Sequence, residues 1–244
     1  MAKRFLFFLF VINKMSYNCF RLVVNRNYTS TLDTVMFSKI VLFDSSVFRY
    51  PPAPLGSNVE ELSGKPYGNK TYTVSASSSE GTAWHLFDDI LHNTYWQTAD
   101  NNTSSNSYNG TTTTNSLDTQ FKGEWVQIQL PHAIQLSSYG IYPFASFEFR
   151  APKTFFLLGA NILPTTTTPI WTLIDSQNIG SIYNSPVTFT IKNIPIIVST
   201  RISTPVSTHA STSVSTSSSY IILIIILALV LGYLVYLYVK SKNV

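Results

Sequence analysis

Histidine has the widest chemical range of the residues in this sequence, because an imidazole can bind a metal or transfer a proton near neutral pH. His85, His92 and His132 fall in the middle of the chain. Their spacing matches no metal-binding motif, and no nucleophile with a partner base accompanies them. The sequence also lacks a Gly-x-Ser-x-Gly element, a phosphate-binding loop and paired carboxylates in an acid–base setting. We therefore predict surface histidines and a protein that is not an enzyme.

Aromatic side chains form the second group with binding chemistry, since their faces can stack on a ligand. Phe, Tyr and Trp together make up 14% of the chain, whereas charged residues make up 11%. Large aromatic residues more often fill a core than face water. This rule predicts core positions for most of Trp84, Phe87, Trp96, Trp125 and Trp171. A loop position stays open for Tyr95 and Trp96.

The segments that must position these residues alternate in the manner of β-strands. Apolar and polar residues alternate over 72–76, 125–130 and 187–191, which on a strand places one face in a core and the other in water. Shorter strands are predicted at 136–142, 154–158 and 171–174, with polar surface loops at 101–119 and 164–169. Many short strands and few helical windows predict an all-β domain, a β-sandwich or jelly roll.

The proline-rich run Tyr50-Pro-Pro-Ala-Pro54 marks the predicted start of this domain, because proline cannot enter a central strand. We assign residues 50–198 to the domain and residues 1–49 to a leader. The leader begins with Lys3 and Arg4 ahead of an apolar stretch at 5–12, as in a signal peptide, but no Ala-x-Ala cleavage site follows. A signal peptide and a disordered segment both stay open for it.

Charge and cysteine content exclude nucleic-acid-binding proteins and disulfide-rich or thiolate metal-binding domains. Residues 1–50 hold seven Lys and Arg against two Asp, whereas residues 51–200 hold six basic and ten acidic residues. An acidic domain lacks the clustered cations whose counterion release drives nucleic-acid binding, so no nucleic-acid partner is expected. The single cysteine, Cys19, falls outside the predicted domain, which excludes an internal disulfide framework and a thiolate metal site.

Residues 220–239 carry a membrane signal. These 20 residues contain no charge, and 14 of them are Ile, Leu or Val. As a helix they would extend about 30 Å, the thickness of the hydrocarbon core of a bilayer. Three tyrosines near one end adjoin Lys240 and Lys242, as in an interfacial aromatic belt with a basic stop. We predict a single-pass transmembrane helix followed by a short basic tail at 240–244, on the cytoplasmic side.

The segment before this helix is a spacer. Ser and Thr supply 14 of the 21 residues at 199–219, a composition that stays extended and hydrated as a stalk. With a working signal peptide the domain lies outside the cytoplasm, and without one the helix becomes a tail anchor. The first orientation, which puts the domain in an extracellular or lumenal space or on a virion surface, is favoured by five Asn-x-Ser/Thr sequons at Asn27, Asn69, Asn101, Asn102 and Asn109.

Four motifs follow one another across the domain. They are GNKTYTVSASS at 68–78, AWHLFDD at 83–89 ahead of Tyr95-Trp96, WVQIQLP at 125–131, and RAPKTFFLLGA at 150–160 ahead of Trp171. Over about residues 60–175 their order resembles the discoidin domain, also called the coagulation factor V/VIII type C domain, and the Tyr-Pro-Pro start is similar to copies encoded by large DNA viruses. The resemblance implies a galactose-binding-like jelly roll without catalytic activity. It further implies recognition of carbohydrate, lipid headgroups or a protein partner through loops at one end.

The chain departs from that pattern twice. After Gly159-Ala160-Asn161 the sequence ILPTTTTP replaces the family's Asn-Asp-Gly turn, and the family's closing strands are absent after Lys192. We therefore expect a sandwich that is short of a strand or completed irregularly.

The resemblance also points to site residues. Asp88 and Asp89 stand where many members have Asp-Gly, in a loop that binds calcium in some of them, and carboxylates suit calcium. Asp89 replaces that glycine, so a calcium site and an ordinary solvated turn are both open. His92, Asn93, Tyr95 and Arg150 flank loops of the resembling motifs, and we predict that they contact a ligand.

These inferences predict a membrane-anchored, non-catalytic binding module that recognises carbohydrate or a lipid headgroup in attachment or adhesion. The alternative is a structural envelope or membrane protein that uses the sandwich for protein–protein contacts. Neither function needs a cofactor, apart from the calcium ion considered at Asp88 and Asp89.

Overall fold

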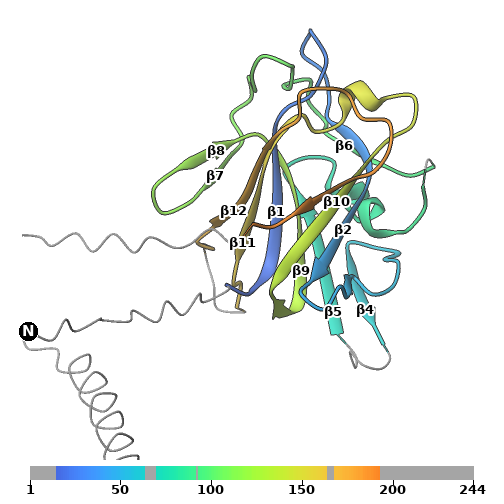
Figure 1. Ribbon diagram of the computed structural model, residues 1–244, viewed down its shortest axis with the longest axis vertical. Coiled ribbons are helices and arrows are strands. Elements are labelled where there is room, and N and C mark those ends of the chain that lie inside the picture. Colours follow the sequence, from blue (N-terminus) through green and yellow to red (C-terminus); the bar gives the residue numbers. More distant parts are fainter. Residues whose placement is uncertain (1–14, 64–69, 92, 164–167, 193–244) are drawn as a thin grey trace, which may run out of the picture. The chain divides into compact units, whose positions relative to one another are not determined.

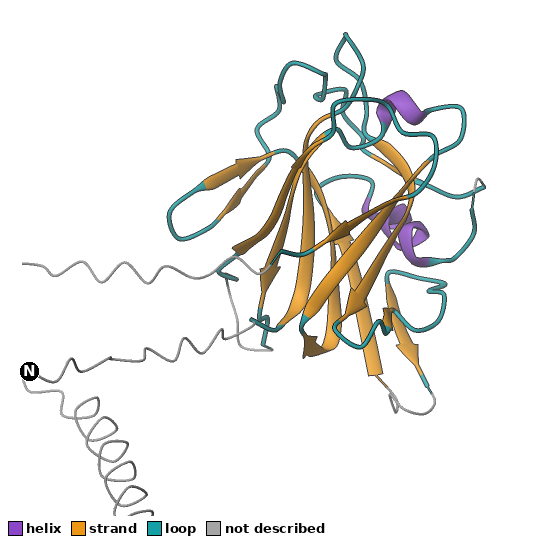
Figure 2. Cartoon of the chain, in the orientation of Figure 1, coloured by secondary structure: helices purple, strands orange, loops and turns teal. Residues whose placement is uncertain are grey.

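The computed structural model of the chain describes residues 15–63, 70–91, 93–163 and 168–192. These residues all belong to one compact unit of the chain. Strands dominate it, and its helical content is two short 3₁₀ helices, η1 (Glu80–Phe87) and η2 (Glu148–Arg150) (Figure 2). The predicted all-β class is confirmed.

Two antiparallel sheets pack face to face (Figure 1). The six-stranded sheet has the order β12 (Thr172–Asn178), β11 (Thr154–Ala160), β1 (Tyr17–Arg26), β9 (Glu124–Ile134), β5 (Lys70–Ala76) and β4 (Val59–Leu62). The five-stranded sheet has the order β13 (Val187–Thr190), β10 (Leu136–Pro143), β2 (Met36–Asp44) and β3 (Arg49–Tyr50), with β6 (Trp96–Gln97) also paired to β2. A separate hairpin joins β7 (Thr113–Asn115) to β8 (Gln120–Lys122).

The main core lies between the two sheets. Alternate residues of β1, such as Leu22 and Val24, point into it from one sheet, and Leu42 and Ile141 point into it from the other. Each of these side chains is less than a tenth exposed. Burying such a side chain stabilises the fold by about 1.5–3 kcal/mol, so this interface supplies most of the driving force for folding.

A second, smaller cluster covers the outer face of the six-stranded sheet. Cys19 and Val23 of β1 pack there against Phe121 of the β7–β8 hairpin and against Trp171. Strand β1 is therefore apolar on both faces. Burial raises the pKa of the Cys19 thiol to about 12, which keeps it protonated and inert at neutral pH.

Arg21 connects the parts of this outer cluster. The Arg21 guanidinium lies 3.7 Å from the ring centroid of Trp125 and 4.2 Å from that of Trp171. Its Nε donates to Gln127 Oε1 at 3.0 Å, and its Nη1 donates to Thr114 Oγ1 of the hairpin at 2.9 Å. Burial lowers the pKa of Arg21 to about 10, which leaves it charged at neutral pH. The cation thus binds the hairpin to the sheet through aromatic faces and neutral acceptors.

The predicted domain start at residue 50 is wrong. β1 lies between β11 and β9, and β2 lies between β10 and β3, so both strands before residue 50 occupy inner positions of their sheets (Figure 1). Residues 15–49 therefore belong to the domain, and Cys19 is fully buried within it. With ten basic and twelve acidic residues over 15–192, the corrected domain is still acidic.

The six strands expected from the sequence are present as β5, β9, β10, β11, β12 and β13. The predicted loop at 101–119 is partly wrong, because it contains β7.

No helix within the described residues is long and apolar enough to cross a membrane. The stalk at 199–219, the helix at 220–239, the tail at 240–244 and residues 1–14 of the leader lie outside the described residues.

The position of β1 and β2 generates a truncation test. A fragment of residues 15–192 should give a β-sheet circular dichroism spectrum and a cooperative thermal transition. A fragment of residues 50–192 should be unfolded or aggregated, because it loses two inner strands and exposes the strands that paired with them. A soluble, cooperatively folding 50–192 fragment would show that β1 and β2 are dispensable.

Buried tyrosines set a pH limit on stability. Burial raises the pKa of Tyr28 to about 12, and burial together with the hydrogen bond to Glu124 raises the pKa of Tyr108 to about 12. An unfolded tyrosine titrates near pH 10, so the stability that each contributes is complete below about pH 10 and is lost as pH rises through about 12. Urea unfolding followed by tryptophan fluorescence should show a constant midpoint up to about pH 9 and a steep fall between about pH 10 and 12. A midpoint that stays flat through this range contradicts the burial of both groups.

Candidate functional site

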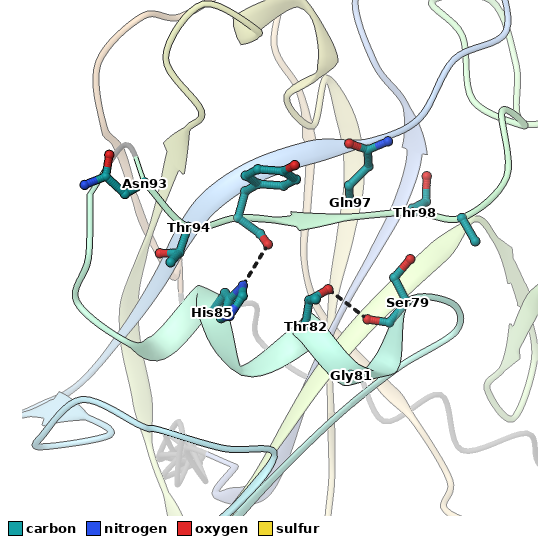
Figure 3. Close-up of a pocket in the computed structure, with 10 residues that line it drawn as sticks. Ser79, Gly81, Thr82, His85, Asn93, Thr94, Gln97 and Thr98 are labelled. Atoms are coloured by element: carbon teal, nitrogen blue, oxygen red, sulfur yellow. Dashed lines mark hydrogen bonds between the residues drawn. The ribbon is translucent and has the colours of Figure 1, made fainter.

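One open pocket at the surface combines polar side chains with an aromatic wall. It lies between η1 and the segment around β6 and has a volume of about 620 Å³ (Figure 3). Ten residues line it: Ser79, Gly81, Thr82, His85, Asn93, Thr94, Tyr95, Gln97, Thr98 and Ala99. None of these ten is Asp, Glu, Lys or Arg, so the described lining carries no carboxylate, ammonium or guanidinium group.

The two walls of the pocket are held by buried apolar residues. Leu86 and Phe87 anchor η1 in the main core. On the opposite wall, Trp96 is fully buried and meets Phe37 of β2 edge-on, with ring centroids 5.7 Å apart. The indole Nε1 of Trp96 donates to the Ser78 carbonyl oxygen at 3.1 Å. Since Ser78 immediately precedes the lining residue Ser79, this bond joins the two walls.

The helix wall carries polar groups on one side. Thr82 and His85 are spaced by three residues, and a 3₁₀ helix has three residues per turn, so they fall on one face of η1, which Ser79 precedes as its N-cap residue. Figure 3 shows Thr82 and His85 on the side of η1 that faces the β6 segment. His85 Nδ1 lies 3.3 Å from the Tyr95 carbonyl oxygen, and Thr82 Oγ1 donates to the Ser79 carbonyl oxygen at 3.1 Å.

An exposed aromatic strip continues from the pocket. The side chain of Tyr95 is 37% exposed, and its ring lies 4.6 Å from that of Phe144. Phe144 stacks on Phe147 at 6.0 Å, and Phe147 lies 6.0 Å from Phe149. We call these four residues the aromatic strip. Tyr95, the member of the strip that lines the pocket, gives it an apolar border beside its hydroxyl and amide groups.

The buried carboxylate of Glu124 forms hydrogen bonds with segments that adjoin the pocket. Glu124 of β9 is 2% exposed. Its Oε1 accepts from the Tyr108 hydroxyl at 2.5 Å, and its Oε2 accepts from the hydroxyls of Ser77 and Ser78 at 2.6 and 3.3 Å. The Ser78 hydroxyl in turn accepts from the Ala99 amide at 3.1 Å, and Ala99 lines the pocket. Glu124 thus ties β9, the start of η1 and the loop after β6 together.

The structure brings together two of the four predicted ligand residues. Asn93 and Tyr95 line the pocket, whereas His92 lies outside the described residues. Arg150 is engaged elsewhere: its Nε lies 3.2 Å from Asp33 Oδ2, and its Nη1 donates to Thr34 Oγ1 at 3.3 Å. Arg150 therefore does not line this pocket, and its contact with a ligand stays a prediction.

The aspartates do not fit the calcium alternative. Asp89 forms ion pairs with Lys39 and Arg49. Burial alone would raise the pKa of Asp89, but hydrogen bonds and charges from Arg49 and Lys39 outweigh it and lower the pKa. Asp88 accepts from the Ile90 amide at 2.8 Å through Oδ1. Within the described residues, no three His, Cys, Asp or Glu side chains gather as a metal site would need. Two cations already neutralise the carboxylate that calcium would require.

The prediction for the large aromatic residues is confirmed for the majority. Phe87, Trp96 and Trp171 are buried, while Trp84 and Trp125 are half-buried. His132 is exposed, as predicted, and His85 is half-buried in the pocket wall. Sequence reasoning missed Ser79, Thr82, Gln97 and Thr98. The sequence carried no signal for them, because their grouping depends on a 3₁₀ helix at 80–87 that the alternation pattern does not predict.

The chain matches no protein-family model, no curated protein and no solved structure. The comparisons therefore identify no discoidin domain, which stays a prediction from the sequence motifs.

The Glu124 network generates a stability prediction. Glu124→Ala removes the carboxylate that accepts from the Tyr108 hydroxyl, and an unsatisfied buried polar group costs about 1–3 kcal/mol. It also removes one of the two acceptors of the Ser77 hydroxyl, which keeps the Trp125 carbonyl oxygen. We expect the variant to lose about 2–4 kcal/mol of unfolding free energy in urea. Glu124→Gln, which keeps the shape and one acceptor oxygen, should lose less.

A matched control is Glu148→Ala, since Glu148 is a half-buried surface residue of η2. Equal stability of the Ala variants at 124 and 148 would contradict the structural role of the network.

Proposed function

We propose that this chain is a membrane-anchored, non-catalytic binding module that recognises carbohydrate through the pocket between η1 and β6. The observation that carries the proposal is the composition of the pocket. Neutral hydroxyl and amide side chains stand beside the exposed ring of Tyr95. Sugars present hydroxyl groups that need both donors and acceptors, together with apolar C–H faces that pack on aromatic rings.

The polar groups of the pocket suit such a ligand. Asn93 and Gln97 each offer a carbonyl acceptor and an amide donor, and the Ser79 hydroxyl offers both. The Thr82 hydroxyl offers an acceptor, because its proton is donated to the Ser79 carbonyl oxygen. Tyr95 supplies the ring face, and its neighbour Phe144 extends it. A few polar groups around an apolar wall are typical of small-molecule sites.

The architecture proposed for this module is a galactose-binding-like jelly roll of the discoidin type. Two facing antiparallel sheets and the order of the four sequence motifs support it. The membrane anchor is proposed from the uncharged apolar residues 220–239, with the Ser/Thr-rich residues 199–219 as the stalk. The five sequons favour a domain that faces an extracellular or lumenal space or the outside of a virion.

A second function is favoured by a separate observation, the aromatic strip. Phe147 and Phe149 are 36% and 37% exposed and adjoin one another. Exposed aromatic side chains are enriched at protein–protein contacts. In this alternative the domain is a structural envelope protein that binds neighbouring protein molecules. A lipid headgroup is the third ligand class, and the same strip would then face the membrane surface.

A glycan array with residues 15–192 separates these functions. Saturable binding that free sugar inhibits supports carbohydrate recognition, and a blank array with concentration-dependent self-association supports the structural alternative. Vesicles of neutral and anionic phospholipid test the lipid class by co-sedimentation.

Variants at the pocket sharpen the test. Tyr95→Ala and Asn93→Ala should each weaken glycan binding about tenfold or more in titration calorimetry, since about 1.4 kcal/mol corresponds to tenfold. Phe149→Ala is the matched control, because Phe149 is equally exposed but does not line the pocket. If Phe149→Ala abolishes binding while Tyr95→Ala leaves it unchanged, the pocket is not the binding site.

A further inference from the structure

The glycosylation sequons differ in how accessible their asparagine and hydroxyl residues are in the folded domain. An asparagine in Asn-x-Ser/Thr accepts a glycan on its side-chain nitrogen Nδ2, and a bulky glycan must stand in solvent. Four of the five sequons fall within the described residues, and Asn69 lies outside them.

Asn27 is closed to modification in the folded domain. Its exposure is 0%. Its Nδ2 donates to the carbonyl oxygens of Thr34 and Thr103, each at 3.3 Å. Its Oδ1 accepts from the Thr29 amide at 3.1 Å and from the Thr29 hydroxyl at 2.8 Å. Thr29 is the hydroxyl residue of the same sequon, so both functional groups of the sequon are used to fold the loop after β1.

Asn109 shows the opposite arrangement. Asn109 and Thr111 are both exposed, in the loop between β6 and β7. The residue just before them, Tyr108, is 8% exposed and donates its hydroxyl to Glu124. A Cβ on Gly110 would collide with the Tyr108 hydroxyl and ring, so glycine is needed there for the loop to pass over the ring. The buried side chain of Tyr108 therefore holds this loop on the domain, while Asn109 and Thr111 face water.

The overlapping sequons at Asn101 and Asn102 are intermediate. Asn101 is exposed, but Thr103, which completes its sequon, is fully buried. Thr103 also exchanges backbone hydrogen bonds with Asp33, at 2.7 and 3.2 Å. Asn109 is thus the sequon whose asparagine and threonine both stay accessible after folding, among the four that are described.

We propose that Asn109 carries an N-linked glycan in the mature protein and that Asn27 remains unmodified. In this reaction Asn109 Nδ2 forms a bond to the anomeric carbon of an oligosaccharide carried on a polyprenyl pyrophosphate. The bond between that carbon and the pyrophosphate oxygen breaks, the lipid pyrophosphate leaves with the electron pair, and the amide gives up one proton. The inference rests on the lumenal orientation within the proposed function, and it does not depend on what the pocket binds.

The test is expression of the full chain in cultured animal cells, extraction in mild detergent and site mapping. Peptide N-glycosidase converts each glycosylated asparagine to aspartate, which mass spectrometry of proteolytic peptides locates. We expect conversion at Asn109 and none at Asn27 in the monodisperse, trypsin-resistant fraction. Asn109→Gln should remove one glycan, seen as one step in gel mobility, without changing the thermal transition of the domain.

A reporter variant makes a negative result informative. Gly180→Thr completes an Asn-x-Thr sequon that begins at Asn178, which is exposed, and a Cβ at position 180 meets no atom within 4 Å. A glycan on the reporter at Asn178 together with an unmodified Asn109 overturns the inference. The domain would then have reached the lumen, but its Asn109 loop would not have been glycosylated. Modified Asn27 in the folded fraction also overturns it.

If the reporter and Asn109 both stay unmodified, the lumenal orientation is wrong and the inference fails with it. Carbohydrate binding by residues 15–192 produced in bacteria is measured separately, so the two failures are distinguishable.

Discussion

A buried carboxylate that must be fully hydrogen-bonded is the constraint on which the candidate site depends. Glu124 has almost no contact with water, and a buried polar group without partners is costly. It meets this requirement with hydroxyls from Tyr108, Ser77 and Ser78, which come from two separate loops. The hydrogen bonds that Glu124 needs therefore hold both loops in place, and the two walls of the pocket adjoin these loops. The same bond to Tyr108 also holds the loop that presents Asn109 to solvent.

The strands with clear alternation were predictable, because each has one face in the core and one in water. β9 and β5 alternate in burial along nearly their whole length, as their sequences do. β1 was not predictable in this way. Cys19 and Val23 face the outer cluster while Leu22 and Val24 face the main core, so the strand has apolar residues on both sides and no period of two. β2 also lacks a period of two, because every residue from Met36 to Leu42 is buried, including the polar Ser38 and Lys39.

The candidate site was only partly predictable for a related reason. Asn93 and Tyr95 lie next to motifs that resemble the discoidin domain, so adjacency in the sequence was enough to select them. Arg150 was selected on the same ground, but its partner Asp33 lies in a segment assigned to the leader, and that pairing depends on the tertiary fold. Asp89 is a similar case, because Lys39 and Arg49 also precede residue 50. The residues before position 50 thus supply both missing strands and the ion-pair partners of Arg150 and Asp89.

The central claim is that the pocket between η1 and β6 binds a sugar. Two-dimensional NMR of isotope-labelled residues 15–192, titrated with single neutral and charged monosaccharides, tests it most directly. If the pocket binds a sugar, at least one of them should cause saturable chemical-shift changes concentrated at the amides of 79–85 and 93–99. No shifts with any sugar, or shifts confined to Phe147 and Phe149 and their neighbours, would contradict it.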